Sequence, residues 1–223
     1  MTVKRRDFLI GAGALAATPV LAQEAPTPAA PPALPPPAAG MVRVALNTGQ
    51  GTIVLDLNQE KAPITAGNFL RYIDQKRYDG STFYRASRPP NATTADYGVI
   101  QGGLENNPAK ILKAIAHEPT TKTGLKHVDG TISMGRNAPG TATSDFFICI
   151  GDSAYLDANP DAPGDNLGFA AFGQVVQGMD VVKKILVLPT SPTKGVGVMK
   201  GQMLEPRVSI KTARRVVASD GRS

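Results

Sequence analysis

Residues 130–150 read GTISMGRNAPGTATSDFFICI, and this run carries the clearest information about the fold. Two segments rich in β-forming residues, 131–134 and 145–150, are separated by the Gly, Pro, Asn and Thr residues that are typical of turns. Successive side chains of a strand point to opposite faces, so the neighbours Phe146 and Phe147 must face opposite ways. One of these two rings therefore lies outside the barrel or sheet core.

Short strand-like segments also occur on both sides of this run, each bounded by Gly or other turn residues. Two segments show helical spacing instead: one begins at Pro63, which suits the first turn of a helix, and the other covers 178–185. Many short strands with only two helices favour an all-β fold with a closed antiparallel barrel over a parallel sheet. The other predicted strands are 41–46, 52–57, 82–86, 99–101, 172–176 and 208–212.

Charge and cysteine content exclude two classes of protein. The formal net charge is +6, but the charges are interspersed in sign apart from small clusters such as Arg214-Arg215. They form no basic stripe with interleaved aromatic residues, so we expect no nucleic-acid binding. The single cysteine, Cys149, rules out an internal disulfide framework and sits in an apolar run that predicts a buried thiol.

His117 and His127 match no metal-ligand spacing, so we expect no metal site.

The N-terminus has the order of a signal peptide, in which Lys4, Arg5 and Arg6 precede an apolar segment, Phe8–Ala22. This segment is too short, and too rich in Gly and Ala, for a membrane span. Small residues at −3 and −1 predict cleavage after Ala22, and hence a periplasmic protein without stable membrane insertion. The Arg-Arg-x-Phe-Leu order resembles a twin-arginine export signal, and a Sec-type signal that carries two arginines is the alternative.

Composition divides the rest of the chain into three parts. Residues 23–40 are almost entirely Pro, Ala and other small residues, which cannot bury a core. This composition predicts an extended spacer. Residues 41–213 carry the strand and helix patterns and form the predicted domain. Residues 214–223 are expected to be a flexible tail.

Several segments, taken in order and spacing, resemble the cyclophilin family of peptidyl-prolyl cis-trans isomerases. Phe83-Tyr84-Arg85 resembles the segment that carries the family's catalytic arginine, and Gln101-Gly102-Gly103 follows at a similar distance. Each motif is weak alone, whereas their order along residues 41–211 is specific. The other matching segments are 130–134, 144–148, 155–157 and 172–181.

The resemblance implies an eight-stranded antiparallel barrel closed by two helices, with a proline-binding groove on its outside. It implies isomerisation of X-Pro bonds in proline-containing peptides and unfolded exported proteins, with neither a metal nor an organic cofactor. Arg85 and Gln101 take the catalytic positions. The substrate-binding positions are Gly98, Val99, Gly135, Arg136, Asn137, Asp145, Phe147, Tyr155, Leu156 and Phe169.

Some of these positions depart from the family pattern. The family usually has an aromatic residue at Gly98 and glutamine at Asp145, so we expect an open pocket wall and an altered grip on the peptide. Tyr155 stands where Trp or Phe is usual, which predicts weak cyclosporin binding. The Arg136 side chain has no assigned role and is expected to be solvated. A proline-binding chaperone or assembly module with little turnover is the alternative function.

Overall fold

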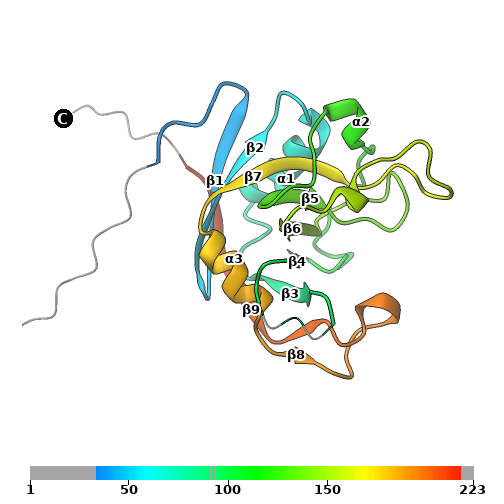
Figure 1. Ribbon diagram of the computed structural model, residues 1–223. Coiled ribbons are helices and arrows are strands. Elements are labelled where there is room, and N and C mark those ends of the chain that lie inside the picture. The colour runs from blue at the N-terminus through cyan, green and yellow to red at the C-terminus, as the bar shows by residue number, and fades with distance from the viewer. Residues whose placement is uncertain (1–33, 91, 93, 217–223) are drawn as a thin grey trace, which may run out of the picture. The chain divides into compact units, whose positions relative to one another are not determined.

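The computed structural model describes residues 34–90, 92 and 94–216 (Figure 1). The predicted signal peptide and most of the predicted spacer, residues 1–33, lie outside the described residues, as do 217–223 of the predicted tail. The fold described below belongs to the compact unit that begins at Pro36. Among the described residues, none of the helices has both the length and the apolar character that crossing a bilayer requires.

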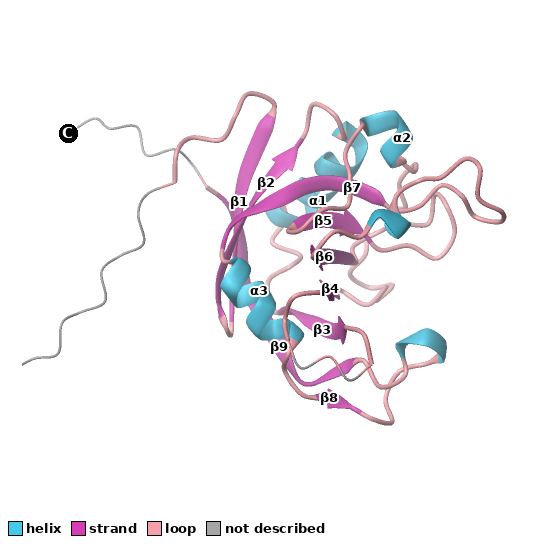
Figure 2. Ribbon diagram, viewed as in Figure 1, coloured by secondary structure: helices cyan, strands magenta, loops and turns pink. Residues whose placement is uncertain are grey.

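In the described residues, nine antiparallel strands form one sheet, and pairing of β1 with β9 closes it (Figures 1 and 2). Strand β8, Thr190–Ser191, pairs only with β9 and lies outside the ring, which leaves eight strands in the barrel. The ring order is β1, β2, β7, β5, β6, β4, β3, β9. Their bounds are β1 Met41–Thr48, β2 Gly51–Asn58, β3 Ser81–Ser87, β4 Gly98–Gly103, β5 Thr131–Met134, β6 Phe146–Ile150, β7 Ala170–Gln177 and β9 Met203–Arg215. The predicted closed eight-stranded barrel is confirmed.

Two longer helices cover the openings of this ring. Helix α1, Pro63–Asp74, packs against β2, β7 and β9, and α3, Met179–Leu186, packs against β2, β3, β4 and β6. Each helix therefore contacts strands from separate parts of the ring, as a cover over a barrel end must. Pro63 occupies the first turn of α1, as its fixed φ and missing N–H favour. Sequence patterns missed the short α2, Thr120–Thr123, because a single helical turn has no apolar periodicity.

Aromatic rings from α1 and the barrel strands meet in the core. Phe69 of α1 makes an edge contact with Phe146 of β6, with ring centroids 5.2 Å apart, and lies 5.3 Å from Phe172 of β7. Phe146 is fully buried in this cluster, so it is the inward member of the Phe146–Phe147 pair. Cys149 is also buried and unpaired, and burial raises the pKa of its thiol to about 12, as an inert packing role requires.

The C-terminal boundary differs from the sequence prediction. Arg214 and Arg215 were expected in the flexible tail, but both belong to β9 and pair with Ala45 and Val44 of β1. Their guanidinium groups also form ion pairs with Asp79 and Asp74. The basic pair looked like a tail in the sequence because its partners lie more than a hundred residues away.

Candidate active site

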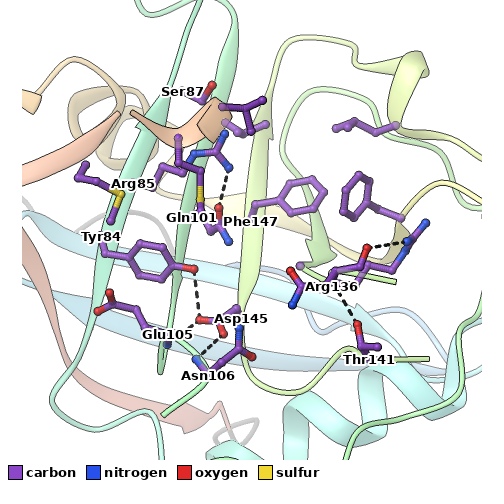
Figure 3. Close-up of a pocket in the computed structure, with 18 of the residues that line it drawn as sticks. Tyr84, Arg85, Ser87, Gln101, Glu105, Asn106, Arg136, Thr141, Asp145 and Phe147 are labelled. Atoms are coloured by element: carbon purple, nitrogen blue, oxygen red, sulfur yellow. Dashed lines mark hydrogen bonds between the residues drawn. The ribbon is translucent and has the colours of Figure 1, made fainter. Parts of the chain in front are cut away.

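A cavity of about 570 Å³ lies on the outer side of strands β3, β4 and β6 (Figure 3). All of the predicted site residues except Gly98 line it. These residues are Arg85, Val99, Gln101, Gly135, Arg136, Asn137, Asp145, Phe147, Tyr155, Leu156 and Phe169. Residues separated by more than eighty positions in the sequence therefore share one surface depression.

A β-bulge in β3 turns two consecutive side chains toward this cavity. The pairing register of β3 shifts between Phe83 and Arg85 against both β4 and β9. Phe83 is buried in the barrel core, whereas Tyr84 and Arg85 both line the cavity. A bulge adds one residue to a strand and re-aims the side chains that follow it. Simple alternation would have placed only one of Tyr84 and Arg85 on the outer side.

Two glutamine side chains hold the Arg85 guanidinium. Its Nη1 donates to Gln101 Oε1 and its Nε donates to Gln202 Oε1, each over 2.8 Å (Figure 3 draws the Gln101 bond). Both acceptors are neutral, and within the described residues Arg85 forms no ion pair. Partial burial lowers the pKa of Arg85, but a guanidinium remains protonated. The site thus presents a fixed cation whose charge is not neutralised.

The apolar part of the cavity lies beside this cation. On β4, Val99 and Gln101 face the cavity while Ile100 between them is fully buried in the core. On β6, Phe147 faces the cavity and meets Phe169 edge to face, with ring centroids 5.3 Å apart. Leu156 also lines this part. The arrangement can bury a small apolar ring next to a hydrogen-bond donor.

Arg136 is not the solvated side chain that the sequence suggested. Its side chain is only 4% exposed, and its Nε donates to the carbonyl oxygen of Gly168 over 2.9 Å. The guanidinium binds both carboxylate oxygens of Asp165 and lies 5.2 Å from the centre of the Phe169 ring. Arg136 therefore fixes the loop that carries Phe169. Its partners lie about thirty residues further along the chain, so no local pattern could reveal them.

The Asp145 carboxylate lines the cavity but is bonded to the chain around it. It accepts hydrogen bonds from the backbone N–H groups of Glu105 and Asn106, at 2.8 and 3.0 Å, and from the Tyr84 hydroxyl at 3.3 Å. Glu105 and Asn106 both have positive φ, which costs free energy in residues with a Cβ. Burial raises the pKa of Asp145. Asp145 thus holds a strained turn at one end of the cavity (Figure 3).

Gly98 does not form a wall of the cavity, and that expectation is corrected. It precedes Val99 on β4, so a side chain there would point inward, to the same side as the buried Ile100. A Cβ on Gly98 would lie 2.3 Å from the carbonyl oxygen of Ser87 and 3.1 Å from Leu186 of α3. Its φ of +146° also favours glycine. Glycine is required here by close backbone packing.

The rim includes residues that the sequence did not single out. They lie near the predicted residue Tyr155, which stands at the rim with 70% of its surface exposed. The segment before β9 contributes Val198, Met199 and Gln202, and β9 itself contributes its first residue, Met203. That segment has neither alternation nor helical periodicity, so no sequence signal marked it. Further lining residues that were not predicted are Tyr84, Ser87, Glu105, Asn106 and Thr141.

A buried polar group supports the apolar wall from behind. The His127 ring lies 6.0 Å from the Phe147 ring in a stacked arrangement. Its Nδ1 is 2.7 Å from Asp157 Oδ1 and its Nε2 is 2.9 Å from Ser133 Oγ. His127 and Ser133 are almost completely buried. Asp157 and Ser133 therefore fix the orientation of the His127 ring, and the Phe147 ring packs against that fixed ring.

His127 should make the stability of the protein depend on pH. Burial lowers its pKa below the ordinary 6.5, and Asp157 only partly offsets this effect. The unfolded chain then binds a proton more readily than the folded protein, so the free energy of unfolding should fall as the pH drops through 6.5. In His127→Gln this slope should be smaller. Denaturant unfolding between pH 8 and pH 5 measures it, and equal slopes in both proteins would contradict the assignment.

Comparison with known proteins places this geometry in context. Residues 42–214 match the family model described as cyclophilin type peptidyl-prolyl cis-trans isomerase. A peptidyl-prolyl cis-trans isomerase of Acinetobacter baylyi is 37% identical over 149 residues, which cover 66% of this chain and 73% of the relative. One from Streptomyces antibioticus is 35% identical over 156 residues, covering 70% and 89%.

Solved structures agree on the fold. A cyclophilin-type isomerase of Cryptosporidium parvum superposes with a TM-score of 0.61 at 19% identity, covering 79% of this chain and 98% of its own. A second structure, with a TM-score of 0.60 and 19% identity, covers 78% and 99% and was determined in the presence of the dipeptide Ala-Pro. At 19% identity, these two structures show that the chain shares their barrel fold.

Proposed function

The chain belongs to the cyclophilin-type peptidyl-prolyl cis-trans isomerase family and has that family's enzymatic activity, and we propose that it acts at the cavity around Arg85 on X-Pro bonds of exported proteins. The observation that carries the assignment of the site is the Arg85 guanidinium, fixed by two neutral glutamines beside an apolar wall. Proline-containing peptides and unfolded exported chains are the proposed substrates.

The chemistry requires a twisted amide rather than a broken bond. Rotation about the peptide bond crosses a barrier of about 18–20 kcal/mol that arises from amide resonance. A donor near the prolyl nitrogen favours the pyramidal nitrogen of the twisted form, so neither a nucleophile nor a general base is needed. Arg85 supplies this donor, and Gln101 holds it from the β4 side.

Arg85 alone does not account for catalysis. A hydrogen bond to a charged group contributes about 1.5–3 kcal/mol, whereas an acceleration of about 10⁵ requires about 7 kcal/mol. The remainder must come from tighter binding of the twisted form than of the planar form. The wall formed by Val99, Phe147, Leu156 and Phe169 would bury the proline ring and remove water from the amide. The backbone of residues 135–137 would bind the extended peptide alongside.

A protease-coupled assay on a short X-Pro peptide tests the proposal. Substoichiometric protein should abolish the slow cis-to-trans phase, because each molecule turns over many bonds. The alternative is a proline-binding chaperone with little turnover. It would leave the slow phase intact at catalytic amounts and would suppress aggregation of unfolded proteins only in stoichiometric amounts.

Export is the second part of the proposal. It rests on the basic and apolar pattern of residues 4–22, and it predicts a mature periplasmic protein that begins at Gln23. Changing Arg5 and Arg6 together to Lys should leave precursor in the cytoplasm if a twin-arginine receptor reads the signal. Intact-mass analysis of periplasmic and cytoplasmic fractions measures both results. Normal export of the double variant would indicate the Sec route instead.

Cyclosporin binding should be weak and should respond to Tyr155. A tyrosine at the exposed rim lacks the indole N–H that the family's tryptophan would offer to this ligand. We expect Tyr155→Trp to strengthen cyclosporin binding by roughly tenfold, the effect of one added hydrogen bond of about 1.4 kcal/mol. Calorimetric titration of both proteins measures the difference. Tight binding by the wild-type protein would contradict this account of the rim.

A further inference from the structure

Gln202 holds Arg85 from the side opposite Gln101, and it comes from a segment that no sequence motif marked. We propose that Gln202 is a positioning residue for isomerisation, which acts by fixing the orientation of the Arg85 guanidinium. The inference rests on the proposed role of Arg85. A guanidinium has five N–H donors in one plane. Bonds at two different nitrogens, Nε and Nη1, fix that plane.

The two bonds leave part of the guanidinium open to a substrate. Within residues 34–90, 92 and 94–216, Nη2 of Arg85 has no hydrogen-bond partner. Its two N–H groups, and the second one on Nη1, therefore remain to bind a peptide carbonyl oxygen or approach a prolyl nitrogen. Without the bond from Nε to Gln202, the Arg85 guanidinium could rotate about its side-chain bonds, and its free N–H groups would no longer point toward the substrate.

The backbone of Gln202 is attached to β3 beside Arg85. Its carbonyl oxygen accepts a hydrogen bond from the N–H of Ala86 over 3.0 Å, and its own N–H donates to Met199 over 3.1 Å. The next residue, Met203, pairs with Arg85 in the β3–β9 ladder. These bonds use backbone atoms only, so a change of the Gln202 side chain leaves them in place. Substitution should accordingly spare the fold.

The neutral character of Gln202 suits this role. A carboxylate at the same reach would hold the guanidinium equally well, but it would also neutralise the positive charge that stabilises the twisted amide. Gln101 and Gln202 are both amides, so they orient the cation and preserve its field. Partial burial, which lowers the pKa of Arg85, strengthens such orienting hydrogen bonds.

Kinetics of Gln202→Met test the proposal, because methionine has similar length and no comparable acceptor. We expect kcat to fall roughly tenfold, with KM changed by less than about twofold, since aim at the twisted amide is lost while the apolar wall stays intact. Lys200→Met, an exposed position in the same segment, is the matched control and should retain wild-type kinetics. An unchanged kcat in Gln202→Met would overturn the proposal.

A double-mutant cycle separates positioning from general structural damage. In an Arg85→Ala background, Gln202→Met should lower the remaining activity by less than about twofold, because its effect passes through Arg85. An equal loss in both backgrounds would mean that Gln202 acts on the structure and not on Arg85.

Nuclear magnetic resonance of the arginine Nε–H groups gives a readout that does not depend on catalysis. The Arg85 Nε–H should exchange slowly in the wild-type protein and in Gln202→Glu, which keeps an acceptor at the same reach, and rapidly in Gln202→Met. If this pattern appears but the wild-type protein does not isomerise X-Pro bonds, the proposed function fails while the contact stands. Rapid exchange in the wild-type protein would refute the contact itself.

Discussion

Replacing Arg85 with Ala is expected to lower kcat/KM for X-Pro peptides by at least about tenfold and to leave the barrel folded. The side chain lies on the outer side of β3 and is not part of the core cluster, so its removal creates no cavity in the barrel interior. Removing the Arg85 guanidinium removes the only proposed donor to the prolyl nitrogen. It also leaves Gln101 and Gln202 without their common hydrogen-bond partner.

Arg85→Lys is the informative companion to this variant. Lysine keeps the positive charge but lacks the planar fork, so it cannot be held at two nitrogens while a third faces the substrate. We expect activity between the wild type and Arg85→Ala. Thermal unfolding of all three proteins checks the fold. Near-full activity of Arg85→Ala with an unchanged melting curve would refute the central role of this residue.

Gly98→Phe is expected to destabilise the protein severely, by about 3 kcal/mol or more. Even the first carbon of the new side chain would meet the Ser87 carbonyl oxygen at 2.3 Å, and the φ of Gly98 disfavours any residue with a Cβ. The ring would also have to enter a region already filled by Leu186. Low soluble yield or a much lower melting temperature is the expected observation.

Val99→Phe, at the neighbouring position on β4, is the control for Gly98→Phe because it also adds a phenylalanine ring. Val99→Phe enlarges a side chain that faces the cavity, so it should leave the barrel folded while it obstructs peptide binding and raises KM. The sequence suggested instead that Gly98 leaves a pocket wall open, and on that interpretation a phenylalanine there would close the wall and lower KM. A folded Gly98→Phe with wild-type melting and improved KM would restore that earlier expectation.

The contrast between Gly98 and Phe147 shows what sequence patterns can and cannot give. Alternation correctly placed one ring of Phe146–Phe147 in the core and the other outside, because β6 is regular. The resemblance to the family placed both Gly98 and Val99 in the pocket, although alternation lets only one of two successive strand residues face the cavity. A Cβ at position 98 would meet the Ser87 carbonyl oxygen and Leu186 of α3, and no local sequence pattern shows this crowding.

The β3 bulge and the Arg136 contacts had no local signal. The motif around Arg85 indicated which residue matters but not that a register shift would turn Tyr84 toward the same cavity. Arg136 appeared to be a solvated side chain because its partners, Asp165 and Gly168, lie in a loop rich in Asp, Pro and Gly. Strand identities follow from local residue patterns, whereas the supports of a site depend on contacts between loops.

Exchange spectroscopy on one peptide with a single X-Pro bond tests the central claim most directly. The cis and trans forms give separate signals, and uncatalysed interconversion takes tens to hundreds of seconds. A catalytic amount of the wild-type protein should produce exchange peaks between the two forms, and the same amount of folded Arg85→Ala should produce much weaker ones. Absence of exchange peaks with folded wild-type protein, or equal peaks with both proteins, would contradict isomerisation at this cavity.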